Sequence, residues 1–311
     1  MKRVLIAVLA WFLLCTSAYA EADIYIWNPL PEQRLHLRVS PSRDAESLGK
    51  YYNGAPVTRT GYFNHNGWVQ VAVGYGNAVL TGYMDDRYLS YAPSDNAMPQ
   101  YLCIQSTQAY QQPNSHSRPV KVLGGSLISL MGFSDDWWHL VVHTGTSEGD
   151  YSCFMPAGAA ELVSLSDGRP VNAYISNPDS ADRLHLRTSP SADGKSLGKY
   201  YNGCVAVLKG FTLDAKWIEV ELFGRTGCMM REFVYLEGQG SNPTYYGIPT
   251  SSAARNTVLY LDSELTISAQ TVAANQSIEI LGLVNDEVLH VRLNDTYGFM
   301  RWIDTRYTDP K

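Results

Sequence analysis

Charge is scarce in this sequence, and neither sign forms a long run. Charged residues make up 17% of the chain, with 24 Lys and Arg against 30 Asp and Glu. Proteins that bind nucleic acid neutralise phosphates with clustered basic side chains, and anionic membranes attract the same kind of face. The acidic balance and the lack of a basic run therefore argue against a nucleic-acid partner.

Long apolar runs are also lacking after the first residues. Residues 1–20 have the pattern of a secretory signal peptide, with Lys2-Arg3, an apolar run at 4–15 and Ala18-Tyr19-Ala20. That run is shorter than the roughly 20 apolar residues that span a bilayer. We expect cleavage after Ala20, export to the cell envelope (periplasm or cell wall) or secretion, and no membrane insertion afterwards. Loss of Lys2 and Arg3 takes the basic count from 24 to 22 against 30 acidic residues.

Cysteine is sparse, and its spacing excludes the common metal motifs. Four cysteines follow the leader: Cys103, Cys153, Cys204 and Cys228. No two of them have C-x-x-C spacing, and no His lies near them in zinc-finger spacing, so we expect no metal site. An even number in an exported protein indicates disulfides, with three possible connectivities. Closeness in sequence favours Cys103–Cys153 and Cys204–Cys228.

What the sequence does contain is a long internal repeat. RLHLRVSPSRDAESLGKYYNG at residues 34–54 returns as RLHLRTSPSADGKSLGKYYNG at 183–203, with 17 of 21 positions identical at an offset of 149. Shorter copies of the closing segment at 82–89 occur at 227–234, at 298–303 and, more loosely, at 152–155. Repeats at a fixed period indicate an array of similar structural units. We therefore expect four units, at about 21–93, 98–165, 171–237 and 244–308, separated by Pro-, Gly- and polar-rich linkers.

Each unit shows strand patterns and no sustained helical stripe. Residues 35–38 and 68–73 alternate apolar and polar side chains with the period of a half-buried strand. Ser-Pro-Ser and Asn-Gly segments supply turns between them. About five short strands in about 70 residues are typical of a small β-barrel or sandwich, so the predicted fold class is all-β.

The repeated motifs resemble those of bacterial Src-homology-3-like (SH3-like) domains. The resemblance is carried by Leu-His-Leu-Arg-x-Ser-Pro-Ser at 35–42 and 184–191, by Asn-Gly at 53–54 and 202–203, and by Asn66-Gly67-Trp68. It is strong in units one and three, moderate in unit four and weak in unit two. It implies four tandem small SH3-like β-barrels. In the family such domains are binding modules, often for cell-wall peptides, so the resemblance implies a peptide ligand, with the stem peptides of peptidoglycan as one candidate.

Two polar pairs in the repeated strand are candidate ligand contacts. His36 and Arg38, with His185 and Arg187, point away from the alternating core positions. They either contact a peptide ligand or order the adjoining loop through a hydrogen bond and a salt bridge. Ordering of a loop is the commoner use of polar side chains beside turns.

Aromatic residues are the other candidates. Tyr52 and Tyr201 should face outward, where a ring with a polar tip makes a good binding surface. Trp68 and Trp217 open a strand near the loops. They form either the wall of a groove or a partly covered packing position.

Catalytic motifs were sought and not found. His139 and His143 have the two-His spacing of a zinc helix, but Leu140 replaces the required Glu and the valines between them indicate a strand. No Gly-rich phosphate loop follows a strand, and we expect neither enzymatic activity nor a cofactor.

The leading hypothesis is an exported, non-catalytic, multivalent binding protein for peptide or peptidoglycan ligands. The alternative is a structural or interaction protein whose repeats pack on each other or on a partner protein. Exposure of Tyr52 and Trp68 distinguishes the two, because buried rings cannot bind a ligand.

Overall fold

The computed structural model describes residues 24–61, 66–92, 98–144, 149–239 and 247–309. Within these ranges the chain forms 27 strands, three short 3-10 turns and no α-helix, so the all-β prediction is confirmed. None of the described residues forms a helix long and apolar enough to cross a membrane. The expected leader at 1–20 and much of the linkers at 93–97 and 240–246 lie outside the described residues.

The strands occur as four successive sets. The first set is β1 (Ile24–Ile26), β2 (Leu35–Arg38), β3 (Ser47–Tyr51), β4 (Pro56–Arg59), β5 (Trp68–Val73), β6 (Leu80–Asp85) and β7 (Leu89–Ser90). The second is β8 (Gln100–Cys103), β9 (Thr107–Tyr110), β10 (Pro119–Val122), β11 (Leu127–Ser134), β12 (Trp137–His143), β13 (Tyr151–Pro156) and β14 (Leu162–Ser164). The third is β15 (Asn172–Ile175), β16 (Arg183–Arg187), β17 (Ser196–Tyr201), β18 (Val205–Phe211), β19 (Trp217–Leu222), β20 (Arg225–Met230) and β21 (Val234–Leu236). The fourth is β22 (Thr250–Ser252), β23 (Thr257–Tyr260), β24 (Ser268–Val272), β25 (Ser277–Leu283), β26 (Val288–Leu293) and β27 (Thr296–Arg301).

Strand pairing follows the same antiparallel pattern in every set. In the first set, β1 pairs with β4 and β7, β2 pairs with β3 and β6, and β5 lies between β4 and β6. The second and third sets repeat all of these pairings, and the fourth repeats them with an isolated bridge, Ala253 to Thr305, in place of its last strand. The weak sequence similarity of the second set thus hides a shared topology.

The Asn-Gly turns show why the repeated motif folds in the same way twice. Asn53 accepts a hydrogen bond from the backbone N–H of Asn28 (2.8 Å) and donates one to its carbonyl (2.8 Å). Asn202 makes the same pair with Asn177. The following glycines, Gly54 and Gly203, have φ of 84° and 88°, a region that favours glycine. The motif therefore closes the turn and ties it to the first strand.

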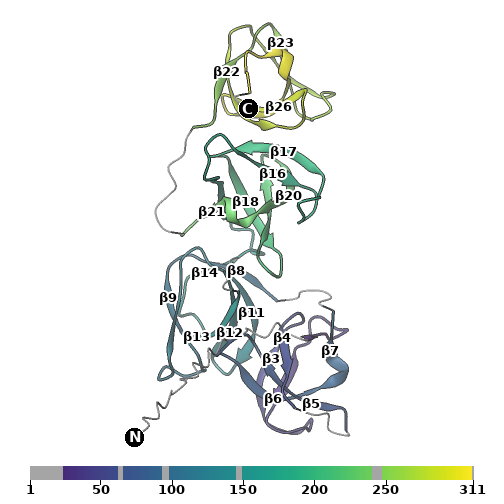
Figure 1. Ribbon diagram of the computed structural model, residues 1–311, viewed down its shortest axis with the longest axis vertical. Coiled ribbons are helices and arrows are strands. Elements are labelled where there is room, and N and C mark those ends of the chain that lie inside the picture. Colours follow the sequence, from purple (N-terminus) through teal and green to yellow (C-terminus); the bar gives the residue numbers. More distant parts are fainter. Residues whose placement is uncertain (1–23, 62–65, 93–97, 145–148, 240–246, 310–311) are drawn as a thin grey trace, which may run out of the picture.

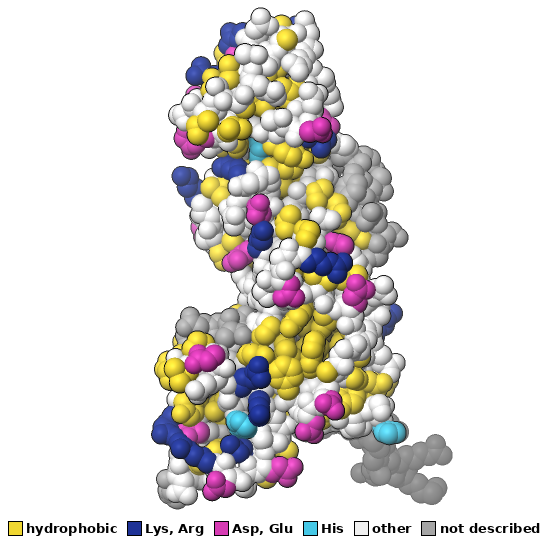
Figure 2. Space-filling model, turned by 180° about the vertical axis from the view of Figure 1, so that it is seen from behind, with side chains coloured by type: hydrophobic (Ala, Val, Ile, Leu, Met, Phe, Trp, Pro, Cys, Tyr) yellow, Lys and Arg dark blue, Asp and Glu magenta, His cyan; other side chains and the backbone are white. Residues whose placement is uncertain are grey.

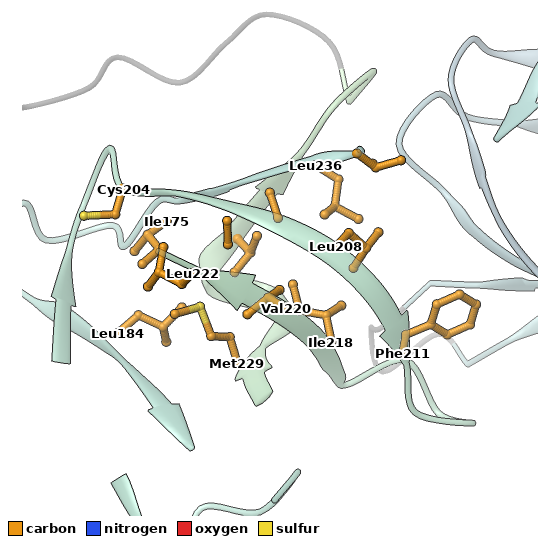
Figure 3. Close-up of a cluster of buried hydrophobic side chains, with 14 of the residues drawn as sticks. Ile175, Leu184, Cys204, Leu208, Phe211, Ile218, Val220, Leu222, Met229 and Leu236 are labelled. Atoms are coloured by element: carbon orange, nitrogen blue, oxygen red, sulfur yellow. The ribbon is translucent and has the colours of Figure 1, made fainter. Parts of the chain in front are cut away.

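Each set encloses a hydrophobic cluster drawn mainly from its own strands. Figure 3 shows the cluster of the third set, where Leu184, Leu208, Ile218, Val220 and Met229 converge from β16, β18, β19 and β20. Alternation produces this packing, because every second side chain of a strand points to the same face.

Two of the three junctions between sets are continuous sheets. β3 pairs with β11, placing Tyr51 opposite Gly132, and β17 pairs with β25, placing Tyr200 opposite Gly282. Sets one and two therefore form one 14-stranded sheet, and sets three and four one 13-stranded sheet. A Cβ at Gly132 would lie 2.3 Å from the carbonyl oxygen of Lys50, so only glycine allows this approach.

A tyrosine–histidine hydrogen bond crosses each of these two junctions. The Tyr51 hydroxyl lies 3.1 Å from Nδ1 of His139, and the Tyr200 hydroxyl lies 3.2 Å from Nδ1 of His290. Both ring pairs have centroids 5.7 Å apart and planes at 73°. Burial lowers the pKa of each histidine to about 3, so both are neutral near pH 7. The duplicated element is thus a pair of sets with its junction included.

The junction between the second and third sets is made by side chains. The Gln100 amide donates to the carbonyl of Phe211 (3.1 Å) and accepts from its N–H (3.2 Å). Leu102, Leu127 and Val163 of the second set belong to the cluster of the third. Figure 1 shows the result: the first two sets lie side by side at one end, with the third and fourth following along the long axis.

The disulfide prediction is wrong, because all four cysteines are free and buried. Cys103 donates to the carbonyl of Gln105 (3.0 Å), and Cys204 donates across a junction to the carbonyl of Leu281 (3.4 Å). Cys153 lies opposite Leu140 and Cys228 opposite Glu219, each in a strand interior. The thiols pack in these interiors as small apolar groups.

Candidate functional site

A hollow of about 260 Å³ in the first set brings together three of the residues singled out in the sequence. His36 and Arg38 reach it from β2, and Trp68 reaches it from the start of β5. The other lining residues include Arg34, Arg43, Asp85 and Tyr88. Three arginines facing one carboxylate give the hollow a basic character, although the chain as a whole is acidic.

Both polar side chains of β2 also order the turn beside it. Arg38 donates to the carbonyl of Ala45 at 2.5 Å. Nδ1 of His36 lies 2.9 Å from Oγ of Ser47, whose own proton is donated to the carbonyl of Gly49 (3.0 Å). Nδ1 is therefore the donor in the His36–Ser47 bond. Burial, and then the charges of Arg38 and Lys50, lower the pKa of His36, so its ring is a neutral contact.

Asp85 supplies the negative charge at the base of the hollow. Its carboxylate accepts two bonds from the Arg87 guanidinium, at 2.9 and 2.6 Å, and Arg43 lies 3.9 Å away. The hydrogen bond from Arg87 is the main reason why the pKa of Asp85 lies below its usual value. Because this carboxylate is already paired, Arg34 and Arg43 keep donors for a ligand.

The third set has a hollow of about 310 Å³ at the same place. His185 and Arg187 line it and make equivalent contacts, with Ser196 (2.8 Å) and the carbonyl of Gly194 (2.8 Å). Burial, followed by neighbouring cations, lowers the pKa of His185 to about 4. Met230 takes the strand position that Asp85 has in the first set, and Asp182 lines the third-set hollow, so the carboxylate of each hollow comes from a different place.

The two tryptophans take different places. Trp68 is only 9% exposed, so just part of its ring reaches the hollow. Trp217 is half-buried at the same strand position and is not among the residues that line the third-set hollow. Of the two uses considered for these residues, packing dominates in both.

The prediction that Tyr201 faces outward is wrong. Tyr201 is 4% exposed; its hydroxyl contacts that of Tyr307 and accepts a bond from Arg183 (3.1 Å) in the junction with the fourth set. Tyr52 is half-buried beside the junction with the second set, with its ring centroid 6.0 Å from that of Phe133. Strand alternation does point both rings away from their own core, but a neighbouring set covers that side.

A row of half-buried rings extends across the first junction. The ring centroids are 6.0 Å apart for Tyr52 and Phe133 and 6.4 Å apart for Phe133 and Trp138. Those of Trp138 and Tyr101 are 5.9 Å apart. We call Tyr52, Phe133, Trp138 and Tyr101 the aromatic row. Figure 2 shows hydrophobic side chains gathered on one face of the lower half of the molecule, with basic side chains along one border.

Arg34 joins the aromatic row to the hollow of the first set. It lines the hollow, and its guanidinium carbon lies 4.6 Å from the centre of the Tyr52 ring and 5.1 Å from that of Phe133. Its counterpart Arg183 is instead paired with Asp309 at 2.8 Å, and both side chains are mostly buried. The arginine and the rings beside it are therefore available on the first pair of sets and covered on the second, while the hollow itself occurs in both.

Sequence reasoning missed the aromatic row and two larger cavities. No sequence signal placed Trp138 beside Tyr52. A cavity of about 910 Å³ lies in the fourth set and includes Glu264, Asp286, Glu287 and Arg301. A cleft of about 610 Å³ separates the second and third sets and includes Arg231. Both include loop residues outside the repeated motif of 34–54 and 183–203, such as Gly124 and Gly125 in the cleft and Asn285 and Asp286 in the cavity.

Comparison with known proteins gives no family. No family model and no curated protein matches the chain. Among solved structures, NlpC2 and NlpC1 from Trichomonas vaginalis are similar at 10% and 12% identity, each with a TM-score of 0.24 over 46% of this chain. The match covers 50% and 48% of those proteins, about half of their length. Within the residues that the structure describes, no group of three or more His, Cys, Asp or Glu could hold a metal ion.

Proposed function

We propose that the chain is an exported, non-catalytic protein that binds peptide ligands through SH3-like repeats, chiefly on its first two sets. The observation that carries this proposal is the position of Arg34. It links a basic hollow containing His36 and Arg38 to the exposed edges of the aromatic row.

The surface offers two kinds of contact that suit a peptide. Arg34 and Arg43 have guanidinium groups that can pair with ligand carboxylates in a two-bond geometry. The row from Tyr52 to Tyr101 offers apolar area at low entropic cost, as aromatic residues at binding surfaces do. A ligand with an acidic group and apolar side chains a few residues away fits both parts.

Peptidoglycan stem peptides are the ligand that we favour within this class. Their support is the resemblance to bacterial SH3-like domains and the leader-like residues 1–20. The third-set hollow, with His185 and Arg187, is a second contact. When one contact of the chain has bound the polymer, the effective concentration of ligand at the other contact rises, which increases the overall avidity.

Co-sedimentation of the purified protein with insoluble peptidoglycan tests the proposal. We expect the protein to sediment with the polymer, and Arg34→Ala to weaken the interaction about tenfold, the typical effect of losing one charge-assisted hydrogen bond. Trp138→Ala should weaken it as well, and Trp138→Phe should restore part of the loss.

Tyr91→Ala is the matched control, because Tyr91 is an aromatic residue that is 73% exposed and lies outside the aromatic row and the hollow. If Arg34→Ala and Trp138→Ala leave the sedimentation unchanged, the ligand binds elsewhere on the chain. Absence of sedimentation would remove peptidoglycan and leave other peptides to be tested by calorimetry.

Two observations favour the alternative, a protein whose repeats serve to pack on one another or on a partner protein. By the exposure criterion stated for Tyr52 and Trp68, the 9% exposure of Trp68 counts against a ligand contact, while the half-buried Tyr52 remains available. Tyr201 is buried between the third and fourth sets, and Arg183 is tied to Asp309 beside it. On the second pair of sets, aromatic residues of the repeated motif thus hold sets together. If peptides fail to bind, we expect the aromatic residues of the repeated motif to serve in packing throughout the chain.

A further inference from the structure

The cleft between the second and third sets contains a cation that pairs with no Asp or Glu of the described residues. Arg231 follows β20 in the short 3-10 turn Arg231–Phe233 and lines the cleft of about 610 Å³ between the two sets. Its side chain is mostly buried and makes one hydrogen bond, from a terminal nitrogen to the carbonyl of Val234 (2.8 Å). Among the described residues no Asp or Glu pairs with it.

Burial without a counter-charge is unfavourable for a guanidinium. Removal from water lowers the pKa of Arg231 to about 10, with no opposing contribution from an acidic group. Buried charges in proteins are normally paired, because an uncompensated one costs several kcal/mol. Arg183 and Arg292, by contrast, pair with Asp309 and Glu279.

The repeated fold does not require an arginine here. Strand register places Asp86, Ala157 and Trp302 at the equivalent positions of the other three sets. Asp86 is paired with Arg59 at 2.6 Å. Arg231 is therefore specific to the one position that faces this cleft.

The other walls of the cleft also favour an anion. Its titratable lining residues in the part of the chain that the structure describes are Lys121, His143, Tyr151 and Arg231, and no Asp or Glu is among them. His143 has both ring nitrogens engaged, with Ser129 (2.9 Å) and with Asp150 (2.7 Å) behind it, and the Tyr151 hydroxyl donates to the carbonyl of Lys121 (3.2 Å). Among the described residues no acidic group pairs with Lys121, so Lys121 and Arg231 supply the charge.

Neutral groups beside these cations indicate an organic anion. Leu123, Val142 and the ring of Tyr151 form apolar wall. The Gln239 side chain accepts from the N–H of Leu236 (3.0 Å), which leaves its amide N–H groups as donors. A guanidinium fork matches a carboxylate in a two-bond geometry, and apolar wall beside it matches a carbon chain.

We propose that this cleft is a binding site for an organic carboxylate of the size of a short peptide, with Arg231 as the residue that pairs with the carboxylate and Lys121 at the rim. The site is separate from the hollow and aromatic row of the first two sets, and the proposal does not depend on them.

Isothermal titration of the full chain tests it with three probes: N-acetyl-trialanine with a free carboxylate, the same peptide as its C-terminal amide, and inorganic phosphate. We expect the free carboxylate to bind about tenfold or more tightly than the amide, since one charge-assisted pair is lost in the amide. Arg231→Met should abolish this difference, and Arg231→Lys should keep only part of it because an ammonium lacks the planar fork.

Arg169→Met is the matched control, since Arg169 is an exposed arginine in the linker between the same two sets, 3.8 Å from Glu161. The titrations are repeated in the Arg34→Ala background, which removes the proposed carboxylate contact of the first-set hollow, so an acid–amide difference that remains there belongs to the cleft. Any one of four results would overturn the proposal. These are equal binding of acid and amide, undiminished binding of the acid by Arg231→Met, tighter binding of phosphate than of the peptide, and no binding of the free acid. If Arg231→Met does not fold, the comparison of acid with amide on the wild type and on Arg231→Lys decides.

Discussion

The junction between the first two sets depends on a hydrogen bond whose direction the structure defines. Nε2 of His139 lies 2.9 Å from the carbonyl oxygen of Ala78, which can only accept, so Nε2 carries the proton. Nδ1 is then the acceptor for the Tyr51 hydroxyl at 3.1 Å. With a pKa of about 3, His139 stays neutral near pH 7, and this arrangement is the only one available to it.

Tyr51→Phe removes the donor and leaves the packing intact. Tyr51 is 0% exposed and His139 is fully buried, so water does not replace the lost hydroxyl. An orphaned buried acceptor costs about 1–3 kcal/mol, which lowers the thermal midpoint by about 2–4 °C for each kcal/mol in a unit of this size. Tyr200→Phe should cost at least as much, because the Tyr200 hydroxyl also accepts from Arg225 (3.2 Å).

Chemical denaturation followed by circular dichroism, with calorimetry in parallel, measures both losses. Tyr91→Phe is the control, because that ring is 73% exposed and a change there should stay within about 0.5 kcal/mol. The reasoning fails if Tyr51→Phe is no more destabilising than this control. It also fails if the m-value of the mutant, the slope of its free energy of unfolding against denaturant concentration, is smaller than that of the wild type. A smaller m-value would mean that the sets had already separated in the native state.

Three further predictions follow from burial at the junctions. The free energy of unfolding should fall as the pH drops from about 6.5 toward 3, because His139 and His290 have folded-state pKa values of about 3 and the unfolded chain binds protons first; each contributes a slope of up to about 1.4 kcal/mol per pH unit. Gly282→Ala should destabilise the protein by about 1–3 kcal/mol in denaturation, since its Cβ would lie 2.3 Å from a carbonyl oxygen, whereas alanine at the open position Gly247 should not. Cys153 and Cys204 should not react with a thiol reagent until the protein unfolds, because burial raises both pKa values to about 12; rapid labelling of the native protein would contradict this.

The two pairs of sets have one architecture and different surfaces. Arg34 lies over the rings of Tyr52 and Phe133, whereas Arg183 is tied to Asp309. A few residues after the last strand therefore decide whether the arginine of the repeated motif is available. This difference places the proposed peptide surface on the first pair.

Much of the architecture could be predicted from the sequence alone. Alternation in segments such as Leu35–Arg38 specifies strands, because one face of each strand must be buried. The offset of 149 and the shared closing segments indicated repeated units, and the turn residues Asn53 and Gly54 were recognised by their chemistry. The structure brings His36, Arg38 and Trp68, which flank neighbouring turns, to one hollow.

Only the tertiary structure decided what lies against the outward faces. Strand period says that Tyr201 leaves its own core, but not that the fourth set covers it, because contacts between sets depend on register across a junction of distant residues such as Tyr200 and Gly282. The same holds for the cysteines, whose side-chain directions no spacing reveals, and for the aromatic row, which the pairing of β3 with β11 assembles. The sequence by itself determined the repeated unit, while its packing against its neighbours determined which side chains remain available for binding.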